Sequence, residues 1–295
     1  MRGMIKKLGF VCTIALLVSL LGAANAAAEE NKEPDDEGLR AQTALQLRAV
    51  PIGLSFLSDV GYRVPLSDSD STLLDGTYRE IGITNNASPS YMWLGPYVQF
   101  LPLAVLELRG SVQYMGYFGT YGYLMTPEDQ SDPDWSLDAI DRSDDLDLGV
   151  PSKGWQVSGS ATGRLKVGNI VSLIPFEYHF VDMAIGETYY ESTFDMLLEP
   201  TDSYWLLKPM AGYVFQMDSL DSYVLSAFRW EHGQTNRTDV TRDIAQLMGI
   251  WKMPGGWWDG HEMQLVVLGG YWVNHPNREG TLYLAGQFKV SWATP

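Results

Sequence analysis

Hydrophobic and polar residues alternate over long stretches of this chain. Between Trp155 and Val167 the odd positions are apolar or small, and the even positions are polar throughout. Segments 106–117 and 282–292 show the same alternation. A period of two places successive side chains on opposite faces of a β-strand. The pattern therefore predicts strands that are apolar on one face and polar on the other.

The same test along the chain predicts about ten strands, with a range of about eight to twelve. They are expected at roughly 46–58, 90–101, 105–118, 154–167, 170–183, 203–216, 222–233, 243–253, 262–274 and 281–293. Tight turns alternate with long polar links, which fall at 59–89, 119–153, 184–202 and 234–242. Antiparallel neighbours joined in this way have all long loops at one end. The sequence thus predicts an all-β fold, an antiparallel up-and-down transmembrane β-barrel.

The first 26 residues have the three parts of a secretory signal peptide. Arg2, Lys6 and Lys7 precede an apolar stretch from Leu8 to Leu21, and the small residues at 24–26 offer a cleavage site. The apolar stretch is shorter than the roughly 20 residues that a membrane helix needs. We therefore expect a signal peptide at 1–26, an acidic disordered periplasmic leader at 27–44 and the barrel at 45–295.

Composition excludes several classes of function. The chain has 295 residues, with 36 acidic against 20 basic side chains and a net charge of −16, so nucleic acid is not an expected partner. Its one Cys, Cys12, lies in the predicted signal peptide. The exported chain would then have no thiol for a nucleophile, a metal site or a disulfide.

A secreted soluble β-sandwich is the alternative fold, because it too has one apolar and one polar face. Aromatic residues near both ends of the outward faces favour the barrel, since membrane barrels carry such belts at both interfaces. The predicted belts are Trp155, Phe180 and Trp230 near the long loops, and Phe100, Trp251 and Trp292 near the short turns.

Charged residues within the predicted strands fall mostly on the face opposite the apolar one. In a barrel this face must point inward, because an Arg or Lys facing lipid costs on the order of 2–4 kcal/mol. The expected lumen network consists of Glu107, Arg109, Arg164, Lys166, Glu177, His179, Lys208, Arg229, Glu231 and Lys289. A lumen about ten strands wide is narrow, so these charges predict a largely plugged interior.

With its signal peptide, its strand pattern and segments such as 90–97 and 110–114, the chain resembles the outer-membrane β-barrels of Gram-negative bacteria over roughly residues 45–293. The resemblance implies export to the outer membrane, contact with outer-membrane lipid and lipopolysaccharide, and insertion by the barrel-assembly machinery, most simply as a monomer. Such chains usually end on Phe or Trp, whereas three residues follow Trp292 here.

Candidate chemistry is sparse, and we expect neither catalytic residues nor a cofactor. His232 lies in a segment similar to that of outer-membrane lipid hydrolases, but Thr235 is one residue too far along and falls on the opposite strand face. The acidic segment 128–147 predicts at most weak binding of divalent cations, because its spacing differs from that of an EF-hand loop.

The sequence therefore favours a non-enzymatic barrel with long acidic external loops, in a structural, adhesive or small-solute-binding role. A narrow outer-membrane channel, a lipid hydrolase that uses His232 and the soluble sandwich are the alternatives.

Overall fold

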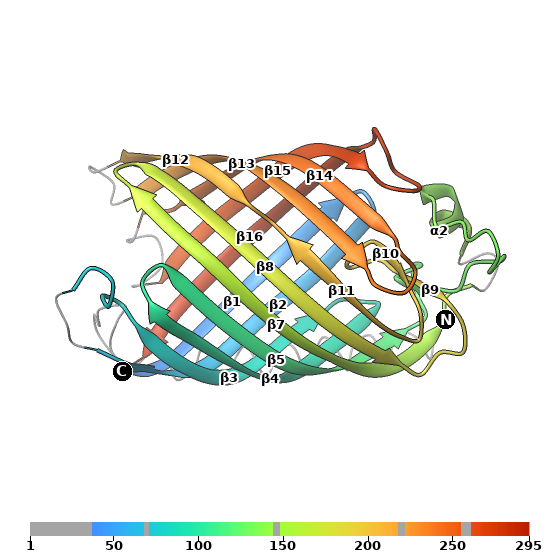
Figure 1. Ribbon diagram of the computed structural model, residues 1–295, viewed down its shortest axis with the longest axis horizontal. Coiled ribbons are helices and arrows are strands. Elements are labelled where there is room, and N and C mark those ends of the chain that lie inside the picture. The colour runs from blue at the N-terminus through green and yellow to red at the C-terminus, as the bar shows by residue number, and fades with distance from the viewer. Residues whose placement is uncertain (1–36, 68–70, 144–147, 218–221, 255–260, 295) are drawn as a thin grey trace.

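Twelve antiparallel strands close into a single barrel in the computed structural model of the protein, which describes residues 37–67, 71–143, 148–217, 222–254 and 261–294 (Figure 1). The strands are β1 (Gly38–Ala49), β2 (Ile52–Pro65), β3 (Tyr78–Ala87), β4 (Tyr91–Leu103), β5 (Leu106–Phe118), β7 (Pro151–Val167), β8 (Ile170–Met183), β11 with β12 (Thr201–Leu207 and Met210–Met217), β13 (Ser222–Thr235), β14 (Thr241–Lys252), β15 (Glu262–Asn274) and β16 (Leu282–Thr294). The predicted all-β antiparallel barrel is confirmed, and a two-layered sandwich is not what forms.

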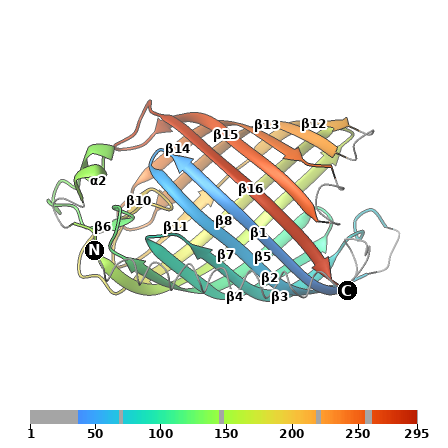
Figure 2. The same ribbon diagram turned by 180° about the vertical axis from the view of Figure 1, so that it is seen from behind.

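The first and last strands close the barrel. β1 pairs antiparallel with β16, from Leu39 opposite Thr294 to Arg48 opposite Ala285, and the two strands lie side by side in Figure 2. Each remaining barrel strand pairs with the barrel strands that precede and follow it along the chain. Among the described residues the sheet therefore has no free edge at which a second chain could add a strand.

One barrel position is shared by two short strands, β11 and β12. Both pair with β8 and both pair with β13, and Lys208 and Pro209 separate them. Pro209 has no N–H to give to the ladder. The backbone N–H of Lys208 still donates to the Pro175 carbonyl over 2.9 Å, and that of Trp230 donates to the Pro209 carbonyl over 3.0 Å. The sheet therefore stays continuous across the break.

The outer wall of the barrel is apolar. Large hydrophobic side chains on the outward faces are exposed on every side of the barrel, for example Ile81, Val157, Phe215, Leu247 and Leu284. On β7 the alternation is the predicted one, because Trp155 and Val157 are exposed whereas Gln156 between them is buried. No helix within the described residues is long and apolar enough to cross a membrane.

The two ends of the barrel differ. The end where β1 begins and β16 ends, called the short-turn end below, has links such as 104–105 and 168–169. The opposite end, called the capped end, has the long links 119–150 and 184–200. These contain β6 (Leu124–Met125), α2 (Leu137–Ser143), β9 (Tyr189–Glu191) and β10 (Met196–Leu198). α2, β9 and β10 lie together at that end in Figure 1, and Figure 2 shows β6 beside α2 and β10.

The predicted count of about ten strands is two too low, because β1 and β3 were assigned to a leader and a loop. β1 begins at Gly38, so the barrel starts before residue 45 and the leader cannot extend to residue 44. Residues 1–36, with the predicted signal peptide, lie outside the described residues. The expected long link 59–89 contains the end of β2, all of β3 and the start of the link to β4. Of the link between β2 and β3, residues 66–67 and 71–77 are described, and they lie at the short-turn end. The link predicted at 234–242 shortens to 236–240.

Candidate functional site

A hairpin made by β9 and β10 enters the lumen at the capped end. Together with β6 it forms a small three-stranded sheet. Its apolar side chains pack against inward side chains of the barrel wall, in a cluster that includes Tyr91, Trp93, Met115, Tyr117, Tyr189, Met196, Leu198 and Tyr204. At the tip, the Phe194 ring lies 5.5 Å from Trp93 and 4.7 Å from Tyr204, measured between ring centroids. The hairpin therefore closes this end of the barrel with an aromatic plug.

Backbone groups at the hairpin tip are held from the barrel wall. Arg48, at the end of β1, donates to the carbonyls of Ser192 over 2.6 Å and of Thr193 over 3.2 Å. The buried carboxylate of Glu191 accepts the backbone N–H groups of Thr193 and Phe194 over 2.9 and 2.8 Å, and the Tyr117 hydroxyl over 2.9 Å. Because Glu191 is almost fully buried, loss of its donors would leave the carboxylate unpaired.

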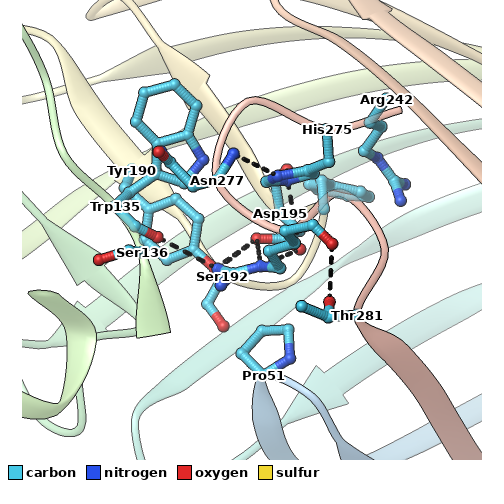
Figure 3. Close-up of polar contacts among 12 residues, drawn as sticks. Pro51, Trp135, Ser136, Tyr190, Ser192, Asp195, Arg242, His275, Asn277 and Thr281 are labelled. Carbon is cyan, nitrogen blue, oxygen red and sulfur yellow. Dashed lines mark hydrogen bonds and ion pairs between the residues drawn. The ribbon is translucent and has the colours of Figure 1, made fainter. Parts of the chain in front are cut away.

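A buried ion pair fastens the hairpin to the link between β15 and β16. Arg278 donates to both carboxylate oxygens of Asp195 over 2.7 Å, and both side chains are almost fully buried. The Tyr190 hydroxyl donates to Asp195 over 2.7 Å, and the Arg278 guanidinium also donates to the Trp135 carbonyl over 3.3 Å. Figure 3 shows Tyr190, Asp195 and His275 converging at this point. Although burial disfavours the charged carboxylate, Arg278 lowers the pKa of Asp195 to about 2.

Three links thus meet in one structure, which we call the cap: the described parts of 119–150, 184–200 and 275–281. Its second apolar cluster joins Met125, Trp135 and Ala139 of the first link to Tyr190 and Leu197 of the second. The ion pair lies against this cluster. The cap is therefore a packed unit and not a set of independent loops.

Acidification is expected to loosen the cap through His275. Burial lowers the pKa of His275 to about 4, whereas an exposed His has a pKa of about 6.5. Between these values an open cap binds a proton that the closed cap does not bind. The free energy that favours the closed cap over the open one therefore falls by up to about 3 kcal/mol as the pH falls from about 6.5 to about 4. Amide hydrogen exchange of residues 184–200, corrected for intrinsic rates, should show opening on the order of tenfold more frequent at pH 5 than at pH 7.

The His275→Gln variant is the control, because other buried groups of the cap also titrate. Burial raises the pKa of Glu191, so protonation of Glu191 would stabilise the closed cap at low pH, which is the opposite of the effect expected from His275. Opening that depends on pH equally in the wild type and in His275→Gln would contradict the assignment to His275.

Below the hairpin lies a cavity of about 300 Å³, which we call the roof chamber. Phe194 and Trp93 line it at the hairpin. Most of its wall consists of uncharged polar side chains from neighbouring strands, among them Asn86, Ser111, Gln113, Gln156, Ser158 and Ser160. The hydroxyls of Ser111 and Ser158 lie 2.7 Å apart, and Gln156 Nε2 lies 2.8 Å from His179 Nδ1. Small side chains on β5 and β7 leave this space open.

A second cavity of about 620 Å³, the vestibule, lies among the strand ends at the short-turn end. It differs from the roof chamber in its charge, because its wall includes Arg40, Arg63, Glu80, Glu107, Arg164 and Lys289. Arg63 pairs with Glu80 over 2.8 Å, and Arg164 pairs with Glu107. Lys289 makes no ion pair within the described residues.

The Arg109–Asp59 ion pair stands where the two cavities meet, because both side chains line both of them. The pair spans 3.0 Å, and Arg109 also donates to Gln99 over 3.2 Å. Its guanidinium lies 4.0 Å from the centre of the Tyr97 ring. Both charged side chains are about a quarter exposed. The pair is therefore positioned to narrow the passage between vestibule and roof chamber.

The predicted lumen charges fall into separate groups. Lys208 donates to Glu177 over 2.8 Å, and His179 lies beside the same carboxylate at 3.3 Å. On β13, next to β11 and β12 in the wall, Glu231 is held between Arg229 and Arg242, and the Arg242 contact measures 2.6 Å. Glu107, Arg109, Arg164 and Lys289 line the vestibule. Lys166 is exposed beside the tight turn after β7 and joins none of these groups.

Charge does not fill the lumen, so the expectation of a charge-plugged interior needs correction. The pairs lie along the wall and leave both cavities open. The opposite side of the lumen is filled by an apolar cluster from β12 to β16, made of Val214, Leu225, Ala227, Met248, Leu268 and Ala285. Closure at the capped end comes from aromatic rings of the hairpin. Alternation in sequence could not distinguish these arrangements, because it gives only the face of each residue.

The predicted belt residues lie on outward strand positions. Phe100, Trp155 and Phe180 are exposed, whereas Trp230, Trp251 and Trp292 are partly buried. The indole of Trp230 donates to Asp243 over 3.2 Å, and that of Trp251 donates to Ser222 over 3.2 Å. Whether these rings mark two membrane interfaces stays a prediction.

His232 faces outward near the capped end. Its Nδ1 lies 2.7 Å from Asp243 Oδ1, and Asn274 donates to the other oxygen of Asp243 over 3.2 Å. Thr235 is buried on the inward face, as the strand period predicts. Among the described residues no hydroxyl forms a hydrogen bond with His232. The His–Asp pair thus has the orientation of a base but no adjacent nucleophile.

The described part of the acidic segment 128–147 makes local contacts. Asp129 accepts the Ser131 backbone N–H over 2.8 Å, and Arg142 lies 3.8 Å from Asp134. Asp144, Asp145 and Asp147 lie outside the described residues. Within the described residues no three acidic, His or Cys side chains gather as a metal site, so the expected cation binding stays a prediction.

No protein-family model and no curated protein matches the sequence. Solved structures similar to the barrel include the β domain of the Bordetella autotransporter BrkA, with 11% identity, a TM-score of 0.47 and coverage of 88% of this chain and 100% of that chain. An outer membrane channel from Pseudomonas putida F1 has 8% identity and a TM-score of 0.45, over 90% and 100% of the two chains. LpxR from Salmonella typhimurium has 9% identity and a TM-score of 0.42, over 86% and 99%. Similarities of this size assign neither a family nor an activity, and the fold rests on the strand pairing itself.

Proposed function

We propose that the protein is an outer-membrane β-barrel that binds a small polar solute in the roof chamber. The solute enters through the vestibule at the short-turn end. One observation carries this proposal: a cavity walled mostly by uncharged polar side chains lies between a charged vestibule and a hairpin that closes the opposite end. The chamber volume of about 300 Å³ lies at the lower end of the roughly 300–1,000 Å³ that small-molecule sites span.

The outer wall supports a membrane location. A closed antiparallel barrel satisfies its backbone hydrogen bonds internally, as a lipid environment requires. Exposed apolar side chains cover the outward strand faces, and the charged pairs along β2, β5 and β8 lie inside. Gly38 and Thr294 lie at the same end, as in barrels whose termini are periplasmic. In the proposed orientation the vestibule faces the periplasm, and the cap faces the cell surface among outer-membrane lipid and lipopolysaccharide.

Single cysteines test both the orientation and the access to the chamber, because the only native Cys is Cys12. A membrane-impermeant maleimide should label Arg142→Cys in α2 on intact cells, but Lys166→Cys only after the outer membrane is permeabilised. Ser158→Cys, in the roof chamber, should react with a small methanethiosulfonate reagent after permeabilisation and remain unlabelled by a polymer-linked maleimide.

The three variants control one another, because the same reagents must reach the cap, the short-turn end and the roof chamber in turn. Labelling of Ser158→Cys on intact cells would contradict closure by the cap. A Ser158→Cys that reacts with neither reagent under any condition, in a folded barrel, would refute an accessible chamber.

A gated narrow channel is the second candidate. It is favoured by the construction of the roof, because one hairpin and its anchors separate the chamber from the capped end. Displacement of that hairpin would join vestibule, chamber and exterior. The Asp195–Arg278 pair is the point at which this candidate can be tested.

A further inference from the structure

We infer that the roof chamber recognises a neutral polyhydroxylated solute, such as a sugar or a polyol. This rests on the proposed function, and it adds the chemical class of the solute. The inference follows from the charge of the chamber wall, from its unpartnered polar groups and from the rings at its roof.

The wall of the roof chamber offers no net charge to a ligand. Its charged side chains are Asp59, Arg109 and Glu177. Asp59 and Arg109 neutralise each other, and Glu177 is paired with Lys208. An ionic solute would have to leave water without finding a free countercharge, which is costly in a closed space. A neutral solute avoids that cost.

Several polar side chains of the wall have no protein partner. Gln113, Ser160, Thr84 and Gln287 line the chamber, and no hydrogen bond of their side chains is found in the described part of the chain. Gln156 uses its Nε2 on His179, while its buried Oε1 has no partner among the described residues. Amides and hydroxyls both donate and accept. They therefore complement hydroxyl groups, which do the same.

Aromatic rings lie directly above these polar groups. Trp93 and Phe194 line the chamber and stack on each other, with ring centroids 5.5 Å apart and planes inclined by 22°. The Trp93 indole N–H is buried and finds no partner in the part of the chain that the structure describes. A sugar ring has C–H groups on its faces, which pack on aromatic surfaces, and hydroxyls around its edge. The chamber thus offers an apolar roof and a polar wall, which match these two parts of the solute.

Equilibrium dialysis tests the inference with D-glucose and xylitol as neutral probes and glucose 6-phosphate as the charged probe. The protein is used as the full exported chain, in a detergent without a sugar headgroup. We expect saturable binding of at least one neutral probe at one site, and at least about tenfold weaker binding of glucose 6-phosphate. Gln113→Leu should weaken neutral binding about tenfold, because it removes a donor and an acceptor from the wall.

Gln246→Leu is the matched control. Gln246 is also a buried inward Gln whose side chain has no hydrogen-bond partner within the described ranges, but it lies on β14 and does not line the chamber. It should leave neutral binding unchanged. If Gln113→Leu does not fold, protection of Ser158→Cys from the methanethiosulfonate reagent by the same probes replaces it.

The outcomes separate this inference from the proposed function. One outcome is that Ser158→Cys is labelled from the periplasmic side while neither neutral probe binds saturably or protects the cysteine. That result would overturn the polyol assignment but leave the proposal of an accessible chamber intact. Equal binding of glucose and glucose 6-phosphate, or equal losses in Gln113→Leu and Gln246→Leu, would also overturn it. An unreactive Ser158→Cys would remove both.

Discussion

Replacing Asp195 with Asn is expected to release the cap and to let the barrel conduct ions. The change keeps the shape of the side chain but leaves Arg278 buried without its counterion, and breaking such a pair costs about 3–5 kcal/mol. The hairpin would then leave the lumen, and its loss would connect the vestibule to the capped end. Planar bilayer recordings should show a silent wild type and discrete conductance steps in Asp195→Asn.

Glu199→Gln is the control for this experiment, since it breaks an ion pair of the same link. Glu199 pairs with Arg237 over 3.3 Å, but both side chains are about half exposed, and exposed pairs contribute about 0–1 kcal/mol. It should stay silent. Removal of both partners, as Asp195→Leu with Arg278→Met, should conduct less than Asp195→Asn, because no buried charge remains. If the Asp195→Asn variant shows no conductance although the backbone amides of its hairpin exchange rapidly, the gated channel is ruled out. In that case the cap has opened and no conducting pore has formed.

An arginine in the middle of the outer wall is expected to destabilise the barrel strongly in lipid. Val157 is 48% exposed and pairs with Val112 near the centre of β5. If this wall faces acyl chains, Val157→Arg should lower the free energy of unfolding by about 2–4 kcal/mol, whereas the same change near an interface costs about 0–1 kcal/mol. Urea unfolding in lipid vesicles measures both.

Val105→Arg supplies the interfacial case, because Val105 is exposed in the turn between β4 and β5. A barrel whose outer wall faced water would treat both arginines as surface substitutions, within about 0.5 kcal/mol of the wild type. Equal and small effects at the two positions would therefore exclude membrane insertion.

Strands with regular alternation were predictable from the sequence, and the two that were missed show why. β3 has Ile81 and Ile83 as its large outward residues, and Asn85 and Asn86 follow in the half nearest the cap. Its apolar face is thus too short to stand out from a polar link. β1 has Ala41 and Thr43 at outward positions and directly follows an acidic segment. Small side chains suffice there because pairing with β2 and β16 fixes the strand.

The cap was beyond sequence reasoning for a different reason. Its main ion pair joins Asp195 to Arg278, and its aromatic packing joins Trp93 to Phe194. Partners so distant in sequence leave no local periodicity. The inward face of β7, by contrast, was assigned correctly, and Gln156 and Ser158 now line the roof chamber. The alternate positions 156, 158, 160 and 162 are all polar and uncharged, and this was the available signal for a solute site.

The pairing of β1 with β16 has a consequence for biogenesis. The first and last barrel strands pair with each other to complete the cylinder. The sheet therefore keeps two free edges until these strands, which are far apart in the sequence, have paired. Proteins dominated by non-local contacts fold slowly and pass through aggregation-prone intermediates. A nascent chain of this protein therefore has no closed partial barrel, and one edge of β1 stays without a partner strand until β16 has been synthesised.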